Sequence, residues 1–148
     1  MHRPPITTNS QQGFTLIELV ITIAVLAILA GIAVPAYQDY VTRGRRAEAM
    51  SQLVELANRQ EQFYGNGNFR YSSTLSVLNV NPTTLPGGHY LLAIPVATTA
   101  RYTLRADALG TQADDTACYR FQLDSQNRRR SFASGGAETT DTANCWPQ

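Results

Sequence analysis

The sequence predicts an α+β chain in which one long N-terminal helix packs on a four-stranded antiparallel sheet, the helix being membrane-spanning in its first half and amphipathic in its second. Three observations predict this arrangement. Residues 13–37 form an almost uncharged apolar run, apolar residues recur at helical spacing between 47 and 64, and apolar and polar residues alternate in segments between 90 and 133. A chain of 148 residues allows one small domain besides the apolar run.

The apolar run is long enough to cross a membrane as a helix. Residues 19–36 would be roughly 27 Å long at about 1.5 Å per residue. Between Phe14 and Ala36 the only charged residue is Glu18, and an acid in hydrocarbon is costly unless it meets a partner. Cleavage between Gly13 and Phe14 would free an α-amine of pKa about 8, which is largely protonated at neutral pH and would neutralise this acid. Solvation of Glu18 among lipid head groups is the alternative.

The hexapeptide GFTLIE at 13–18, followed by the long apolar run, resembles the type IV prepilin signal. The resemblance implies cleavage between Gly13 and Phe14 by a prepilin peptidase and N-methylation of Phe14. It further implies that the helices stack into a filament, in which Glu18 of one subunit neutralises the Phe14 amine of the next. The chain would then divide into a leader (1–13), a transmembrane and filament-core helix (14–37) and a globular domain (38–148).

The charges around the apolar run bear on its orientation. Arg43, Arg45 and Arg46 follow the run, whereas Gln11 and Gln12 stand where prepilins commonly carry Lys or Arg. The positive-inside rule alone would therefore leave the domain in the cytoplasm. We give precedence to the cysteine pair and to the resemblance. Together they imply an inner-membrane precursor with a cytoplasmic leader and a periplasmic domain, and a surface pilus after assembly. A secretory signal is the competing interpretation, opposed by the length of the run and by the acid inside it.

We expect one helix from about Thr15 to Tyr64. Gly31 and Pro35 lie in the second half of the apolar run, and proline removes a backbone hydrogen bond, so a helix kink is expected there. Beyond the run the helix becomes amphipathic, with an apolar stripe facing the rest of the domain. The stripe consists of Ala47, Met50, Leu53, Val54, Ala57 and Tyr64. Residues 65–68, Gly-Asn-Gly-Asn, end the helix because both residue types accept the left-handed conformation of a C-cap.

The remainder of the chain predicts a β-meander. A loop at 69–88, with a short helical turn near 73–78, precedes segments that are rich in β-formers and separated by polar turns. The expected strands are 90–96, 101–108, 118–124 and 129–133, with a loop at 110–116 and an irregular tail after Gly135. This order of elements matches the pilin fold, and it looks most like the PilE-type minor pilins. Trp146 would pack against the sheet.

Two cysteines, Cys118 and Cys145, lie beyond the apolar run. In a small exported domain an even number of cysteines predicts a disulfide, which would stabilise the domain by roughly 3.5 kcal/mol in the chain-entropy treatment. Two buried free thiols are the alternative. In the pilin resemblance the bridged segment would be the D-loop. The sequence has no CxxC or Cys/His cluster, and we expect neither metal nor cofactor.

Two charged groups are candidate ligand sites. Clustered cations bind nucleic-acid phosphates, and some pilins take up DNA through an arginine stripe, with a solvated turn as the alternative. A Ca²⁺ site needs several converging oxygens, and the spacing of three carboxylates here matches no known loop, so we expect solvated side chains and treat Ca²⁺ binding as the alternative. The basic run is Arg128, Arg129 and Arg130 in a hairpin turn, with Arg101, Arg105 and Arg120 on neighbouring strands; the acids are Asp107, Asp114 and Asp115.

These features predict a structural subunit, of the minor-pilin kind, of a type IV pilus that supports twitching motility or adhesion. Its expected partners are the prepilin peptidase, other pilin subunits, the inner-membrane assembly platform, and membrane lipid before assembly. A type II secretion pseudopilin and a DNA-uptake pilin binding DNA through the arginines are the alternatives. The sequence has no GxSxG, HExxH or P-loop motif, and a lone His89 in a glycine turn is expected to be solvated, so we predict no enzyme.

Overall fold

The computed structural model describes residues 13–80, 85, 87–139 and 142–146. The chain divides into two compact units between Gln38 and Asp39. In the described residues, one long helix is followed by four strands and a short C-terminal helix. The predicted leader lies outside the described residues except for Gly13, as do loop residues 81–84 and 86.

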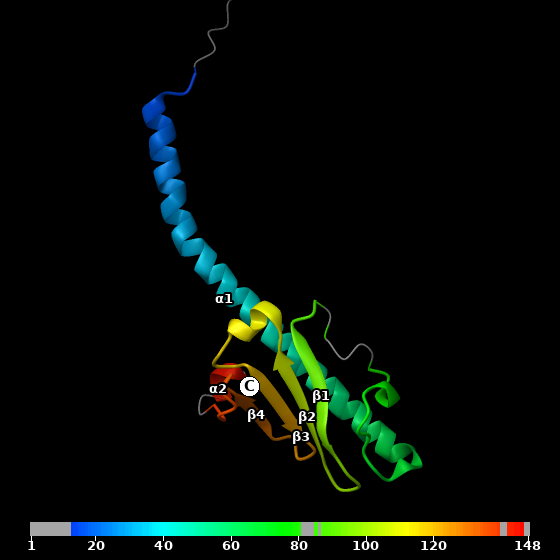
Figure 1. Ribbon diagram of the computed structural model, residues 1–148. Helices are drawn as coiled ribbons and strands as arrows, with labels where there is room; N and C mark the ends of the chain where they lie inside the picture. The colour runs from blue at the N-terminus through cyan, green and yellow to red at the C-terminus, as the bar shows by residue number, and fades with distance from the viewer. Residues whose placement is uncertain (1–12, 81–84, 86, 140–141, 147–148) are drawn as a thin grey trace, which may run out of the picture. The chain divides into compact units, whose positions relative to one another are not determined.

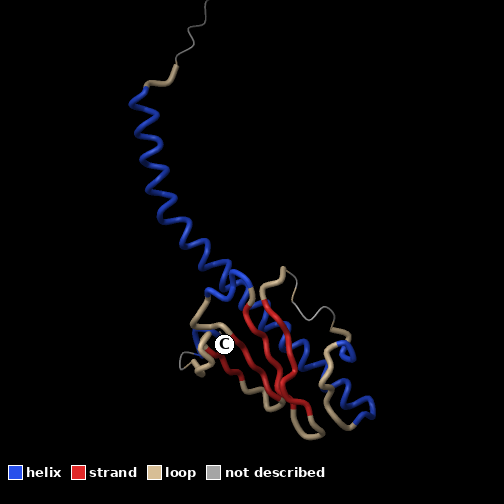
Figure 2. Tube along the Cα trace, viewed as in Figure 1, coloured by secondary structure: helices blue, strands red, loops and turns tan. Residues whose placement is uncertain are grey.

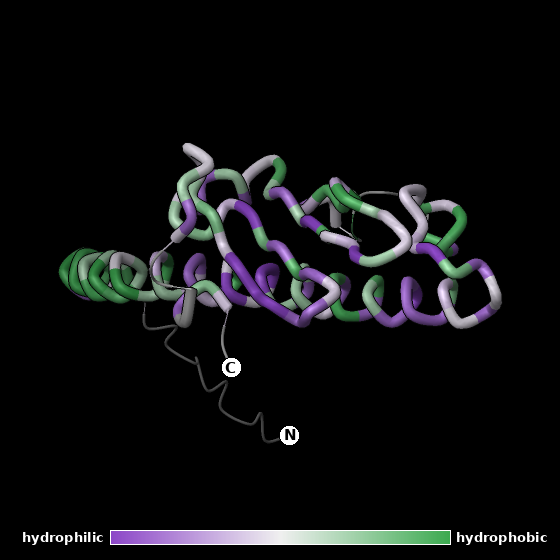
Figure 3. Tube along the Cα trace, turned by 90° about the horizontal axis from the view of Figure 1, so that it is seen from below, coloured by the Kyte–Doolittle hydropathy of each residue, from purple (hydrophilic) through white to green (hydrophobic). Residues whose placement is uncertain are grey.

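Helix α1 spans Leu16–Phe63, within one residue of each predicted end. All of its residues in the first unit, 16–38, are exposed, and the turns of this part are predominantly apolar (green in Figure 3). The mean hydropathy of α1 reaches 2.7 in an 18-residue window, so the helix is long and apolar enough to cross a membrane. Pro35 lies inside the helix, and the kink predicted at Gly31 and Pro35 stays a prediction.

In the second unit, α1 lies along one face of the sheet (Figure 1), and it buries Ala49, Met50, Leu53, Leu56 and Gln60. The predicted stripe is partly wrong, because Ala47 and Val54 are exposed. At about 100° per residue, both lie roughly a third of a turn from the packed face. The predicted stripe left out the buried Ala49 and Leu56, and the polar Gln60 also belongs to the packed face. The Gln60 amide is satisfied by Ser72, donating to its carbonyl at 2.7 Å and accepting from its N–H at 2.8 Å.

The end of α1 follows the prediction closely. A π-turn, Tyr64–Asn68, follows the helix, and within it Gly67 has a φ of 88° that glycine adopts without strain. The connecting loop contains one 3₁₀ turn, Ser76–Leu78, among its described residues. Arg59 of α1 fixes that turn, since its guanidinium donates to the carbonyls of Leu78 at 3.1 Å and Asn79 at 2.7 Å.

The four predicted strands form one antiparallel sheet, which Figure 2 shows side by side in chain order. They are β1 (Tyr90–Ala97), β2 (Tyr102–Ala108), β3 (Arg120–Asp124) and β4 (Arg129–Phe132). One face is buried against α1 through side chains such as Leu104 and Phe121. The predicted α+β fold, a long helix packed on a four-stranded antiparallel sheet, is confirmed.

The C-terminal segment is more regular than predicted. Glu138 forms a bridge with Phe132, and residues 142–145 form helix α2 (Thr142–Cys145), where we predicted an irregular tail. The predicted loop at 110–116 likewise contains a 3₁₀ turn, Gly110–Asp114. Trp146 is buried as predicted, with its ring centroid 5.6 Å from that of Phe121.

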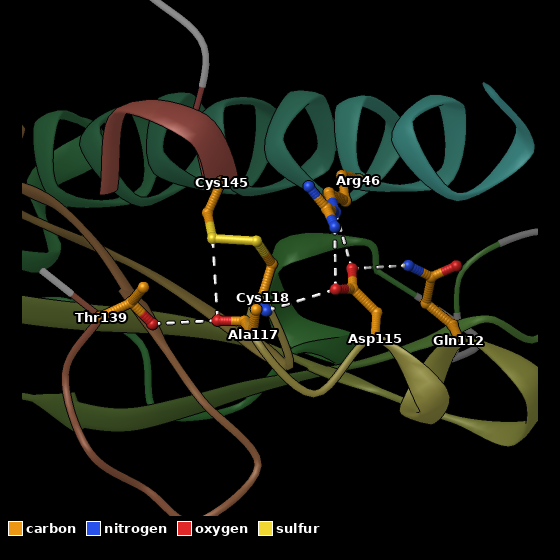
Figure 4. The surroundings of a disulfide bond; sticks show 7 residues. All are labelled: Arg46, Gln112, Asp115, Ala117, Cys118, Thr139 and Cys145. Atoms are coloured by element: carbon orange, nitrogen blue, oxygen red, sulfur yellow. Dashed lines mark hydrogen bonds and ion pairs between the residues drawn. A yellow bond between two sulfur atoms is a disulfide. The ribbon is translucent and has the colours of Figure 1, made fainter. Parts of the chain in front are cut away.

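The predicted disulfide between Cys118 and Cys145 is present, and Figure 4 shows an ion pair beside it. Arg46 of α1 donates to both carboxylate oxygens of Asp115, at 2.6 and 2.8 Å. Asp115 also accepts from the Cys118 N–H and from the Gln112 amide, each at 3.3 Å. These contacts tie α1 to the segment between β2 and β3, next to the covalent link to the C-terminal segment.

Candidate functional site

The predicted processing segment lies at the start of α1. Gly13, Phe14 and Thr15 are outside the helix, and the Phe14 residue is 87% exposed. The Thr15 hydroxyl accepts the backbone N–H of Glu18 at 3.3 Å, and the Thr15 carbonyl accepts the N–H of Leu19 at 3.2 Å. Thr15 is therefore the N-cap of α1. Our sequence reasoning missed this role, although the Thr-x-x-Glu spacing of a capping box indicated it.

The Glu18 side chain is exposed and has no hydrogen bond or ion pair with any described residue. In a complete capping box this carboxylate would return to the N–H of Thr15, and here it does not. It is therefore available to a cation outside the described chain. Phe14 and Glu18 lie at the same end of α1, as the predicted charge pair between subunits requires, and that pair stays a prediction.

The apolar side chains of the first unit have no cover within their own unit. The leucines, isoleucines and valines from Leu16 to Val34 are 50 to 81% exposed. Full burial of one such side chain is worth about 1.5–3 kcal/mol, and an exposed apolar surface of this extent marks an interaction site. Lipid or other helices must cover it.

The sheet face turned away from α1, with its adjoining turns, carries five of the predicted arginines. We call them the arginine face: Arg101, Arg105, Arg120, Arg128 and Arg130. The strand pairing places Arg105 opposite Gln122 and Gln122 opposite Arg130, so these side chains share that face.

Carboxylates offset part of this positive charge. Asp107 pairs with both Arg105, at 2.7 Å, and Arg120. Asp124 pairs with Arg128 at 2.7 Å, and Glu138 lies 3.9 Å from Arg130. Within the described chain, Arg101 alone of the five has no acidic partner.

A hollow of about 490 Å³ opens on the arginine face. It is lined by Tyr71, Val96, Ala100, Arg101, Tyr102, Thr103, Gln122, Asp124, Ser125, Gln126, Arg128 and Arg130. Among the described residues, the side chains of Arg101, Gln122 and Gln126 have no hydrogen-bond partner. Tyr71 adds an aromatic wall, its ring packed edge-on against Tyr102 at 4.7 Å. Free cationic and amide donors beside an aromatic ring are a combination that nucleic-acid sites use.

One predicted arginine is not on this face. Arg129 and Arg130 are the first residues of β4, not part of the turn, and successive strand residues point to opposite sides of the sheet. The guanidinium carbon of Arg129 lies 5.8 Å from the centroid of the Trp146 ring, in a cation–π contact. The prediction of three consecutive arginines in one patch is therefore wrong for Arg129.

Two of the three acids considered as a Ca²⁺ group, Asp107 and Asp115, are engaged in ion pairs, and we did not expect this group to hold a metal. Asp107 is held by two arginines and Asp115 by Arg46, so these carboxylates do not converge on one point. In the part of the chain that the structure describes, no three His, Cys, Asp or Glu residues are placed to hold a metal ion. His89 is half-buried rather than fully solvated.

Asp124, Tyr71 and Tyr102 in the lining of the hollow have shifted pKa values. Burial alone would raise the pKa of Asp124, but the backbone N–H groups of Arg128 and Gln126 and the Arg128 guanidinium together lower it. Burial raises the pKa of the Tyr71 and Tyr102 phenols, and the charge of Glu61 raises both further. At neutral pH the hollow therefore combines a charged Asp124 with neutral phenols.

The sequence reasoning missed the uncharged residues of the hollow. Gln122 was predictable, because alternation along β3 puts it on the same face as Arg120. Tyr71 and Gln126 come from a loop and a turn, where no period indicates which side a residue faces.

Two known families match the chain, one over the N-terminal apolar segment and one over most of the domain that follows. The family described as the prokaryotic N-terminal methylation motif matches residues 8–34. The family described as type IV minor pilin ComP, DNA uptake sequence receptor, matches residues 35–122, which is more than half of the chain.

Curated relatives are fimbrial proteins and pilins. A fimbrial protein of Moraxella nonliquefaciens is 60% identical over 43 residues, covering 29% of this chain and 28% of the relative. The fimbrial protein EcpC of Eikenella corrodens is 63% identical over 56 residues, 38% of this chain and 37% of the relative. The type IV major pilin protein PilE1 of Neisseria gonorrhoeae is 38% identical over 78 residues, 52% of this chain and 47% of the relative. In each case less than half of the relative's length is matched.

The fold, the apolar helix and these matches define the chain as a type IV pilin. Within that class, it belongs to the family described as type IV minor pilin ComP, DNA uptake sequence receptor. The predicted membership of the type IV pilin family is confirmed.

Proposed function

We propose that this chain is a minor pilin of a DNA-uptake pilus and that its arginine face binds the DNA. The observation that carries the proposal is the family match over residues 35–122. That range contains Arg101, Arg105 and Arg120 of the arginine face. The hollow supports the same function, because it gathers free hydrogen-bond donors from the β1–β2 turn, β3 and the turn before β4 on one surface.

The chemistry of the face fits a nucleic acid. An unpaired guanidinium such as that of Arg101 contacts a phosphate without first breaking an internal ion pair. Side-chain amides such as those of Gln122 and Gln126 both donate and accept hydrogen bonds, so they suit phosphates and base edges alike. The paired arginines hold the surrounding surface in place and limit its net charge.

Salt-dependent DNA binding tests this proposal. The full chain in detergent micelles is titrated with labelled duplex DNA at several salt concentrations. The slope of log affinity against log salt is negative, and each lost phosphate contact makes it shallower by about 0.9. We therefore expect Arg101→Ala/Arg130→Ala to make the slope shallower by about 2 and to weaken binding more than tenfold at low salt.

Arg129→Ala is the matched control, because Arg129 adjoins Arg130 in sequence but lies on the opposite side of the sheet. It should leave the slope unchanged. Absence of binding by the wild type at low salt would reject the proposal. An equal loss of DNA affinity in Arg129→Ala would mean that the DNA contacts the side of the sheet on which Arg129 lies, and it would reject the arginine face as the binding surface.

We further propose that the precursor is anchored in the inner membrane with its leader in the cytoplasm and its domain in the periplasm. A prepilin peptidase cuts it between Gly13 and Phe14 and Phe14 is N-methylated. The assembly platform then takes it into a filament, where the Phe14 amine meets Glu18 of a neighbour. The methylation-motif match over residues 8–34, the exposed Phe14 and the unpaired Glu18 support this sequence of events.

Two variants test these steps separately. Gly13→Leu should leave uncut precursor on a gel, because a bulky residue replaces the glycine before the scissile bond. Glu18→Ala should be cut normally but enter filaments poorly, and incorporation at the wild-type level would reject the charge pair. Roles in twitching motility, adhesion or type II secretion would use the same helix without the arginine face, so DNA binding discriminates them from uptake.

A further inference from the structure

The hydrogen bonds in the first turn of α1 determine whether the Gly13–Phe14 bond lies inside or outside the helix. In an α-helix each N–H bonds to the carbonyl four residues before it. Continued by one turn, α1 would pair the Glu18 N–H with the carbonyl of Phe14, and the Ile17 N–H with the carbonyl of Gly13. Instead, the Glu18 N–H is donated to the Thr15 hydroxyl at 3.3 Å. The Leu19 N–H then bonds to the Thr15 carbonyl at 3.2 Å.

This arrangement leaves the proposed scissile bond outside the helix. Gly13 and Phe14 have no helical conformation, so the carbonyl of Gly13 is not engaged in the helical ladder. Hydrolysis adds water at that carbonyl carbon and breaks its bond to the Phe14 nitrogen, which leaves as the new amine. A carbonyl already bonded within a helix is shielded from such attack by its own backbone.

Without the Thr15 hydroxyl, the helix would be expected to grow. A backbone N–H in apolar surroundings must find an acceptor within the chain. If the Thr15 hydroxyl is absent, the helical acceptor for the Glu18 N–H is the carbonyl of Phe14. That hydrogen bond would make Phe14 part of the helix, and the helix would then begin at the scissile bond.

We propose that Thr15 is a positioning residue for processing: its hydroxyl ends α1 at Leu16 and thereby presents the Gly13–Phe14 bond in a non-helical form. The inference rests on the proposed cleavage at that bond. It also accounts for the incomplete capping box, because the hydroxyl alone stops the helix and Glu18 keeps its carboxylate for a neighbouring subunit.

Cleavage kinetics of two matched variants test the inference. The full-length precursor in detergent is incubated with a prepilin peptidase, and kcat/KM is measured for the wild type, Thr15→Val and Thr15→Ser. Valine keeps the shape and loses the hydroxyl, whereas serine keeps the hydroxyl. We expect Thr15→Val to be cut about fivefold more slowly, because loss of the N-cap removes about this factor of preference for beginning the helix after Thr15 and not one turn earlier. Thr15→Ser should be cut within twofold of the wild type.

A second measurement separates positioning from direct contact with the peptidase. Backbone NMR shifts of Phe14 in micelles should become helical in Thr15→Val and stay non-helical in Thr15→Ser. Wild-type cleavage of Thr15→Val would overturn the inference, and so would slow cleavage without the helical shift. A wild-type precursor that is not cut after Gly13 would reject the proposed processing itself. That outcome is distinguishable because it appears before any variant is compared.

Discussion

The two parts of α1 share one secondary structure but differ in where their apolar surface goes. Residues 16–38 are exposed on every side, whereas residues 39–63 bury one face of the helix against the sheet. A helix that is apolar all round needs partners on all sides, and a striped helix needs one. The comparison shows that the second part packs on the sheet of its own unit, whereas the apolar surface of the first part has no cover within its own unit.

Shortening one leucine in each part is the sharpest test of this difference. Leu53 is fully buried, and Leu26 is 59% exposed. We expect Leu53→Ala to lower the free energy of unfolding of the domain by about 2–5 kcal/mol and Leu26→Ala to leave it unchanged. Urea denaturation followed by Trp146 fluorescence measures both. Equal losses would mean that the first part of α1 also belongs to the core of the domain.

Removing the disulfide is the next largest change, and it acts on the second unit alone. Cys118 and Cys145 are 27 residues apart, and a bridge of this span stabilises by about 3.5 kcal/mol in the chain-entropy treatment. Cys118→Ser/Cys145→Ser should therefore lower the urea midpoint of the domain, while membrane insertion of the precursor stays normal. A variant that loses insertion along with domain stability would show that the two units are not independent.

Comparing two ion pairs sharpens the account within the second unit. The Asp115 side chain is 6% exposed, and Arg46 beside it is 19% exposed, whereas Arg128 in its pair with Asp124 is 59% exposed. Arg46→Ala leaves a buried carboxylate unpaired and should cost about 2 kcal/mol, less than for a fully buried pair. Arg128→Ala should cost about 0.5 kcal/mol. Equal costs in thermal unfolding would contradict the larger stabilising role given to the buried Arg46–Asp115 pair.

The smallest expected effect is the acid sensitivity that Asp124 adds. Its folded pKa lies below the ordinary value of 3.8, because hydrogen bonds from Arg128 and Gln126 and the charge of Arg128 outweigh burial. A lowered folded pKa contributes stability above the unfolded pKa, which is lost as the pH falls below 3.8 through the folded value. In Asp124→Asn the urea midpoint of the domain should therefore fall less steeply as the pH is lowered below 3.8. An unchanged pH profile would contradict the assignment.

The sequence predicted those features that a period or a residue type determines. Alternation located the strands, the glycine–asparagine run located the end of α1, and the even cysteine count predicted the disulfide. The apolar stripe was misplaced at Ala47 and Val54. Gln60 was missed because it is polar and because only the fold brings it to its partner, the Ser72 backbone. Similarly, Arg129 was grouped with its neighbours because adjacency in sequence was given more weight than alternation in β4.

Of the candidate site, the sequence likewise predicted the part that one continuous segment determines and missed the part that the fold assembles. The segment around Gly13 and Glu18 is a local signal, so the residues themselves indicate it. The hollow on the arginine face depends on three segments that only the fold brings together, and its loop residue Tyr71 is 30 positions before Arg101 in the chain. The ion pairs of Asp107 and Asp115 likewise depend on the fold, and they engage two of the three acids that the sequence analysis considered as a Ca²⁺ group.

Mass spectrometry of sheared surface filaments tests the central claim most directly, because it reports both assembly and the N-terminus of the assembled chain. The account predicts that this chain is present in the filaments and begins with N-methylated Phe14. A chain that is absent from them, or that begins at Met1 or beyond the apolar run, would contradict it.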